Sequence, residues 1–183
     1  MQKYQPGNGK DTGMQKKLTT ALFAIYLIVL FWILLLKLGV RFSYMGKRSV
    51  NLIPFSDFLH SNGKINTGET MLNVLIFVPL GLYAGLLFKR WTWRNKVFFF
   101  FLVSLLFEGL QYILKIGAFD TTDMITNLLG GITGLLIFKG IERIFNNSAR
   151  SHKFINIIAT IGTITIISLL VLLKLNMLPI RYQ

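Results

Sequence analysis

The sequence has no cysteine, only two histidines and few acidic residues. Its 183 residues include seven Asp and Glu in total. Without thiols the chain cannot form disulfides, thiolate zinc sites, iron–sulfur clusters or a cysteine nucleophile. His60 and His152 fall on opposite sides of the topology derived below, so neither a His-based triad nor a His metal pair is expected. No cofactor is expected.

The total share of charged residues is also low for a soluble protein. They make up 15% of the chain, whereas a soluble domain normally carries about 25%. Hydrophobic residues reach 53% and lie in long uncharged blocks. This composition excludes a disordered chain and argues against an ordinary soluble globule.

The charge that is present is mostly positive. Twenty Lys and Arg give a net charge of +13. They are not gathered into one stripe, as a nucleic-acid surface would require, but lie between the apolar blocks. That arrangement suits contact with anionic lipid head groups, so the expected partner is a lipid bilayer and not nucleic acid.

Five apolar blocks approach the length that a membrane-spanning helix needs, about 20 residues. Because lipid offers no partner for backbone groups, each block is predicted to be helical. The sequence therefore predicts an all-α integral membrane protein with about five spans and a long loop between the first two. A signal peptide is the competing interpretation of the first block, but the block is too long and no small-residue cleavage site follows. The predicted spans cover about residues 18–38, 70–88, 97–114, 121–139 and 154–174.

The same blocks divide the chain into three parts. Residues 1–17 are predicted to be a mobile polar tail, 18–175 a single transmembrane domain and 176–183 a C-terminal tail. Twelve basic residues fall on the N-terminal side of the membrane and eight on the other. The positive-inside rule then predicts a multi-pass protein of the plasma membrane with a cytoplasmic N-terminus and an extracellular C-terminus.

Polar residues inside apolar spans are costly and are therefore the first candidates for function. Alternation puts the starts of spans two and four on the same side as the end of span three. At about 1.5 Å per residue, Asn73, Glu108 and Asn127 then lie roughly 5 to 9 Å from that side. Gln111 and Lys115 are expected on the same helix stripe as Glu108. The sequence thus predicts a polar cluster in the outer third of the membrane.

Each of these residues also has a purely structural interpretation. Asp120 and Asp123 can be helix N-caps, and Asn73 and Asn127 can hold helices together by hydrogen bonds. Glu108 must pair, reach water or become neutral, so it is a candidate general acid or base. A less favoured alternative is a hard cation such as Mg²⁺ or Ca²⁺ held by Glu108, Asp120 and Asp123.

Glycine pairs predict a close contact between the second and fourth spans. Gly81 and Gly85 form one G-x-x-x-G motif, and Gly130 and Gly134 form another. Small residues at this spacing let two helix backbones approach. Pro79 is expected to kink the second span and to widen a cleft near the polar residues.

Several of these motifs together resemble the VanZ family of glycopeptide-resistance membrane proteins. The resemblance covers about Leu18 to Phe138. Its motifs are Asn51-Leu52-Ile53-Pro54-Phe55, Asn73 with Phe77-Val78-Pro79-Leu80-Gly81, Glu108 with Gln111, and the run from Gly117 through Asp120-Thr121-Thr122-Asp123 to Asn127, followed by Gly130. One departure is Ala118, where many family members carry Arg after the glycine.

The resemblance implies low-level resistance to teicoplanin, a lipoglycopeptide, through lowered drug binding at the cell surface. An outer-leaflet polar cleft would bind the drug or an envelope lipid. The alternative is an enzyme or transporter that acts on a lipid-linked cell-envelope precursor, with Glu108 as its acid, base or proton carrier. A third interpretation is a scaffold. The expected ligand-binding residues are Asn51, Pro54, Phe55, Asn73, Phe77, Glu108, Gln111, Asp120, Asp123 and Asn127.

Overall fold

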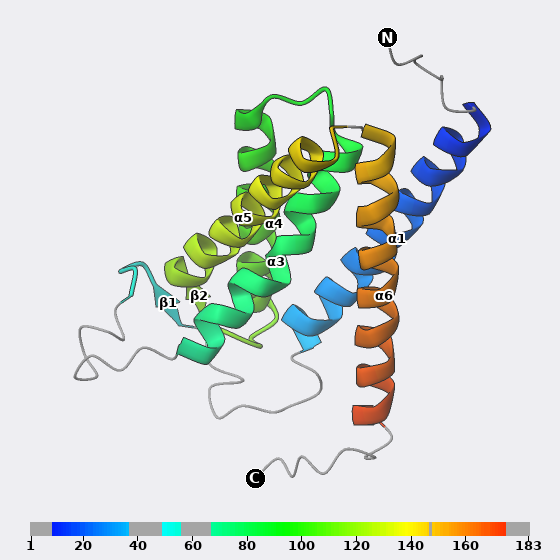
Figure 1. Cartoon of the computed structure of the whole chain (residues 1–183). Helices are drawn as coiled ribbons and strands as arrows, with labels where there is room; N and C mark the ends of the chain where they lie inside the picture. Colours follow the sequence, from blue (N-terminus) through cyan, green and yellow to red (C-terminus); the bar gives the residue numbers. More distant parts are fainter. Residues whose placement is uncertain (1–8, 37–48, 56–66, 147, 175–183) are drawn as a thin grey trace.

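The computed structural model describes residues 9–36, 49–55, 67–146 and 148–174 as a bundle of helices that run alternately up and down (Figure 1). Two very short strands, β1 and β2, pair at one end of the bundle. The helices are α1 (Gly9–Leu36), α3 (Thr67–Leu87), α4 (Trp93–Ile113), α5 (Thr121–Phe145) and α6 (Ser148–Lys174), and the strands are β1 (Val50–Asn51) and β2 (Phe119–Asp120).

Four of these helices are long and apolar enough to cross a membrane. They cover Gly13–Leu35, Thr70–Leu87, Trp93–Leu114 and Thr121–Phe145. The chain is therefore a helical, multi-pass membrane protein. In the described part of the chain, α6, which holds the fifth predicted span, is not among these four candidates. Most of the long loop predicted between the first two spans lies outside the described residues.

The helices extend beyond the apolar blocks that predicted them. α1 begins at Gly9, so the second half of the predicted polar tail is helical, and α5 continues to Phe145. α4 begins at Trp93 because Thr92 caps it, with the Thr92 Oγ1 accepting the Asn95 N–H at 3.3 Å. Hydropathy marks the part of a helix that lies in lipid, whereas caps and charged residues at the interface set its ends.

The closest helix pair is α3 with α5, and all four glycines of the two G-x-x-x-G motifs lie at this contact. A Cβ added at Gly81 would overlap the Gly131 carbonyl, and one at Gly134 would overlap the Val78 carbonyl. At Gly130 it would lie 2.8 Å from the Phe77 Cβ, closer than real contacts allow. A larger residue at these positions must therefore push the two helices apart.

Pro79 lies on a different side of α3 from these glycines. It lines an apolar cavity that faces α1 and α6, not the polar residues whose cleft it was expected to widen. The helix continues through Pro79, and the Tyr26 hydroxyl of α1 donates a hydrogen bond to the Ile76 carbonyl at 2.9 Å. This bond joins α1 to α3 within one helix turn of the proline.

Another polar contact of α1 joins it to α6. Buried Asn156 donates from Nδ2 to the Gln15 side-chain oxygen at 2.9 Å, and its Oδ1 lies 2.9 Å from the Thr19 hydroxyl. We call Gln15, Thr19 and Asn156 the amide–hydroxyl contact.

Candidate functional site

A short parallel pairing brings the loop after α1 to the start of α5. β1 and β2 align Val50 with Phe119 and Asn51 with Asp120. The Phe119 N–H donates to the Ser49 carbonyl at 3.0 Å, and the Thr121 hydroxyl donates to the Asn51 carbonyl at 3.1 Å. The sequence analysis expected no strand, and this pairing fixes the Asn51–Phe55 segment beside the acidic start of α5.

Asp120 is the centre of this arrangement. Its Oδ1 accepts the Thr122 N–H at 2.7 Å, which makes it the N-cap of α5. Its Oδ2 accepts from the Asn51 side chain at 3.1 Å. Its own backbone N–H donates to Glu108 Oε2 at 3.1 Å. One residue therefore connects the loop, α5 and α4.

Glu108 is the most buried acid of the cluster, with 2% of its surface exposed. It follows Phe100 and Ser104 at steps of four residues, so all three lie on the inward face of α4. A carboxylate in this position is costly and is expected to serve a purpose. We call Glu108, Asp120 and Asp123 the acidic cluster.

Asp123 links the cluster to α3. The Asn73 Nδ2 donates to Asp123 Oδ1 at 2.7 Å, and Asn73 is itself buried. Asp123 occupies the first turn of α5, where a negative charge faces the positive end of the helix dipole. The starts of α3 and α5 and the end of α4 thus meet, as alternation of the spans predicts.

Asn127 extends the polar region towards the interior. Its Nδ2 donates to the Ser104 hydroxyl at 3.1 Å, and only 1% of its surface is exposed. Within the described part of the chain, Asn127 Oδ1 is the one buried side-chain polar atom with no hydrogen-bond partner. A buried acceptor left without a donor costs about 1–3 kcal/mol, so Asn127 is a costly residue at this position.

Gln111 and Lys115 do not join Glu108 as the helix stripe suggested. The Gln111 Nε2 donates to the Leu34 carbonyl in the last turn of α1, at 3.1 Å. α4 ends at Ile113, and Lys115 is exposed with a φ of 57°. The Ile116 N–H then closes on the Gln111 carbonyl at 3.0 Å, in the pattern that usually requires glycine. The sequence has no glycine there, so this helix end was not foreseen.

The apolar residues that were predicted to bind the ligand do not lie together in the structure. Phe77 is fully buried in the core, where it packs against Gly130. Pro54 is exposed, and Phe55 is 37% exposed with its N–H bonded to the Thr122 hydroxyl at 2.9 Å. The site also contains three hydroxyls that the sequence analysis did not select: Ser104, Thr121 and Thr122. Their positions, one helix turn before Glu108 and directly after Asp120, are the signal that could have identified them.

The cation alternative is not supported by the geometry. Among the residues that the structure describes, no three His, Cys, Asp or Glu side chains are grouped as metal ligands. The members of the acidic cluster instead accept from a backbone amide or from asparagine side chains.

Comparison with known proteins now identifies the family. A sequence model described as VanZ/LLP1 matches residues 23–146, which is more than half of the chain. The chain belongs to the VanZ family. A curated member, "Protein VanZ" of Enterococcus faecium, is 38% identical over 162 residues, covering 86% of this chain and 94% of that protein. No solved structure matches. The region that matches the VanZ family model contains every member of the acidic cluster.

Proposed function

We propose that this protein protects a bacterium against teicoplanin-type lipoglycopeptides by lowering their binding at the outer face of the plasma membrane. Membership of the VanZ family supports a role in glycopeptide resistance. The bilayer is a partner of the chain, and the drug or an envelope lipid is the proposed second partner. The residues proposed to bind it are the acidic cluster with Asn51, Asn73 and Asn127.

The observation that carries this proposal is the placement of exposed apolar side chains next to the acidic cluster. Leu52 and Ile53 are 68% and 57% exposed, in the loop whose Asn51 bonds to Asp120. Phe55 is held at the same place by Thr122. A polar group and an acyl chain can therefore be bound side by side. Lipoglycopeptides and envelope lipids share this chemistry, whereas a purely soluble peptide lacks it.

The orientation that this role requires is testable with single cysteines, because the chain has none of its own. The basic-residue balance predicts Leu52 outside and Arg90, which follows α3, inside. In intact cells Leu52→Cys should react with an impermeant thiol reagent and Arg90→Cys should not. With α6 proposed as a fifth span, the C-terminus lies outside. The reverse labelling would put the acidic cluster in the cytoplasm and contradict the proposal.

The drug proposal predicts that protection depends on the lipid tail. Burial of an acyl chain contributes about 0.8 kcal/mol per CH₂, so a site that uses the chain should distinguish tail lengths. Inhibitory concentrations should be compared, with and without the protein, across acyl variants of one glycopeptide core. Protection should grow with the tail and largely vanish for deacylated teicoplanin.

Equal protection at every tail length would favour the alternative, an enzyme or transporter of a lipid-linked envelope precursor. The observation that favours this alternative is the depth of Glu108. A carboxyl that is 2% exposed and accepts a hydrogen bond from a backbone N–H is suited to exchange a proton with a bound substrate.

A further inference from the structure

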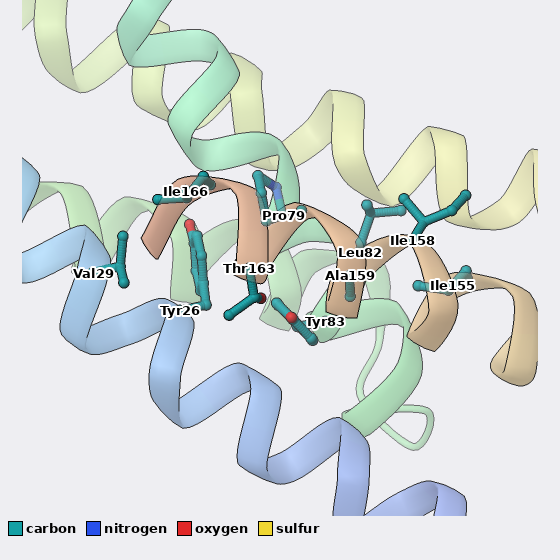
Figure 2. A pocket seen from close by; sticks show the side chains of 11 residues that line it. Tyr26, Val29, Pro79, Leu82, Tyr83, Ile155, Ile158, Ala159, Thr163 and Ile166 are labelled. Atoms are coloured by element: carbon teal, nitrogen blue, oxygen red, sulfur yellow. The ribbon is translucent and has the colours of Figure 1, made fainter. Parts of the chain in front are cut away.

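An apolar cavity of about 170 Å³ lies between α1, α3 and α6, away from the acidic cluster. Figure 2 shows Tyr26 and Val29 of α1 facing Thr163 and Ile166 of α6 across it, with Pro79 and Tyr83 of α3 behind. Its lining is almost wholly apolar. An apolar cavity of about this size stays free of water and accepts an apolar guest.

The cavity opens on the outer surface of the bundle. Its lining residues Ile158 and Ile166 are 48% and 39% exposed. A Cβ added at Gly162, also in the lining, would meet no atom within 4 Å. Because the neighbouring helices span a membrane, the medium that reaches this opening is lipid. An acyl chain is therefore the natural guest.

The length of the cavity corresponds to one leaflet. Along α6 its lining runs from Ile155 to Ile166. At 1.5 Å per residue this is about 16 Å, close to half of the roughly 30 Å hydrocarbon thickness. A single acyl chain that enters from one side of the membrane would follow it over most of its length.

The end of the cavity near Ile155 is basic. Lys153 and Arg150 lie on the first two turns of α6, and Lys16 and Lys17 belong to the part of α1 that meets Asn156 through Gln15. Lys16, Lys17 and Lys153 are exposed. Burial lowers the pKa of His152, with a smaller contribution from Lys89, so His152 adds little charge. A smaller contribution from Glu142 acts in the opposite direction on the pKa of His152.

We propose that this cavity is a binding site for an anionic phospholipid, with one acyl chain between α1, α3 and α6 and its phosphate at the basic end formed by Lys16, Lys17, Arg150 and Lys153. The charge complementarity favours an anionic head group over a zwitterionic one. The site lies at the opposite end of the bundle from the acidic cluster, and its existence does not depend on the drug proposal. The lipid would fill the space between α6 and its neighbours.

The test is photolabelling of the full-length protein in vesicles of phosphatidylcholine and phosphatidylglycerol. Phosphatidylglycerol with a diazirine in its acyl chain is irradiated, and the labelled peptides are mapped by mass spectrometry. Label should concentrate on the α6 peptide that follows Lys153 and on the α1 peptide that contains Tyr26. An equivalent phosphatidylcholine probe should label these peptides several-fold less.

The matched pair of variants is Gly162→Leu and Gly140→Leu. An added Cβ meets nothing within 4 Å at either glycine, but only Gly162 lines the cavity. Gly162→Leu should lower labelling of the α1 peptide several-fold, and Gly140→Leu should leave it unchanged. Ala159→Phe, which fills the same cavity, provides a second variant in case Gly162→Leu does not fold. Joint replacement of Lys16 and Lys153 by Gln should remove the preference for phosphatidylglycerol.

Two results would overturn the proposal. Equal labelling of the α1 peptide in both glycine variants and in Ala159→Phe would show that the probe reports only general lipid contact. Equal labelling by the two lipid probes would show that the basic end selects no head group.

Discussion

Two polar groups of the molecule, the acidic cluster and the amide–hydroxyl contact, each contain fully buried residues but differ in chemistry. Asn156 and Thr19 in the amide–hydroxyl contact are 2% and 0% exposed, and Glu108 in the acidic cluster is 2% exposed. The amide–hydroxyl contact consists of neutral groups that bond to one another. The acidic cluster places three carboxyl groups at the meeting point of α3, α4 and α5.

The difference shows that burial of polar residues alone does not identify a site. Interhelical hydrogen bonds between neutral groups contribute on the order of 1 kcal/mol to stability, so helix packing alone accounts for their presence. A carboxyl in the same surroundings costs several times more than that bond returns. We therefore expect the acidic cluster to be necessary for activity and dispensable for folding, and the amide–hydroxyl contact to add to stability without a role in activity.

The largest expected effect is the loss of the frame that positions the acidic cluster. Gly134→Leu should separate α3 from α5, because its side chain would overlap the Val78 backbone. Overpacking of this kind costs about 3 kcal/mol or more where backbone must move. Thermal unfolding in detergent and membrane yield should both fall sharply. Gly140→Leu on the same helix is the control, and an equal loss there would mean that α5 tolerates no bulk anywhere.

The next effect separates the two polar groups by activity. Glu108→Gln keeps the side chain's shape and removes its charge, so the variant should reach the membrane at normal levels but fail to raise the teicoplanin inhibitory concentration. The measurement pairs that concentration with the amount of protein in the membrane. Unchanged resistance would remove Glu108 ionisation from the mechanism. Lost expression would instead favour the scaffold interpretation, in which a buried network is broken.

A smaller effect, on stability, is expected for the amide–hydroxyl contact. Asn156→Ala removes the bonds to Gln15 and Thr19 and should lower the free energy of unfolding by about 1 kcal/mol. Resistance per molecule in the membrane should stay normal. If Asn156→Ala abolished resistance at a normal protein level, the amide–hydroxyl contact would also be functional, and the distinction drawn here would fail.

The smallest effect tests the turn that carries the chain from α4 to the acidic cluster. Lys115 adopts a φ of 57°. This left-handed backbone conformation costs a non-glycine residue about 1–2 kcal/mol in stability. Glycine would avoid that cost but would lose more entropy on folding. Lys115→Gly should therefore raise the free energy of unfolding by about 0.5–1 kcal/mol and leave resistance unchanged. A fall in resistance without loss of stability would assign the Lys115 side chain a role in binding.

The sequence predicted correctly which polar residues meet where their depth along the spans decides it. Counting along the spans placed Asn73, Glu108 and Asn127 at one level, and the structure brings Asn73 to Asp123 and Glu108 to Asp120. The sequence did not predict contacts that depend on local geometry. Strands of two residues have no periodicity, so the pairing of Asn51 with Asp120 could not be seen. The turn of Gln111 towards Leu34 and the cavity beside Pro79 depend on how three helices meet, which no single segment encodes.

The pairing of β1 with β2 also has a consequence for biogenesis. Asn51 and its partner Asp120 are 69 residues apart in the chain, and Phe55 and Thr122 are 67 apart. The ribosome releases the Asn51 loop first, so it must wait while α3 and α4 are made and inserted. Only when the start of α5 emerges can the loop find its partners. The acidic cluster is thus completed late in synthesis, and a chain truncated before Asp120 would contain Glu108 but none of its neighbours from α5.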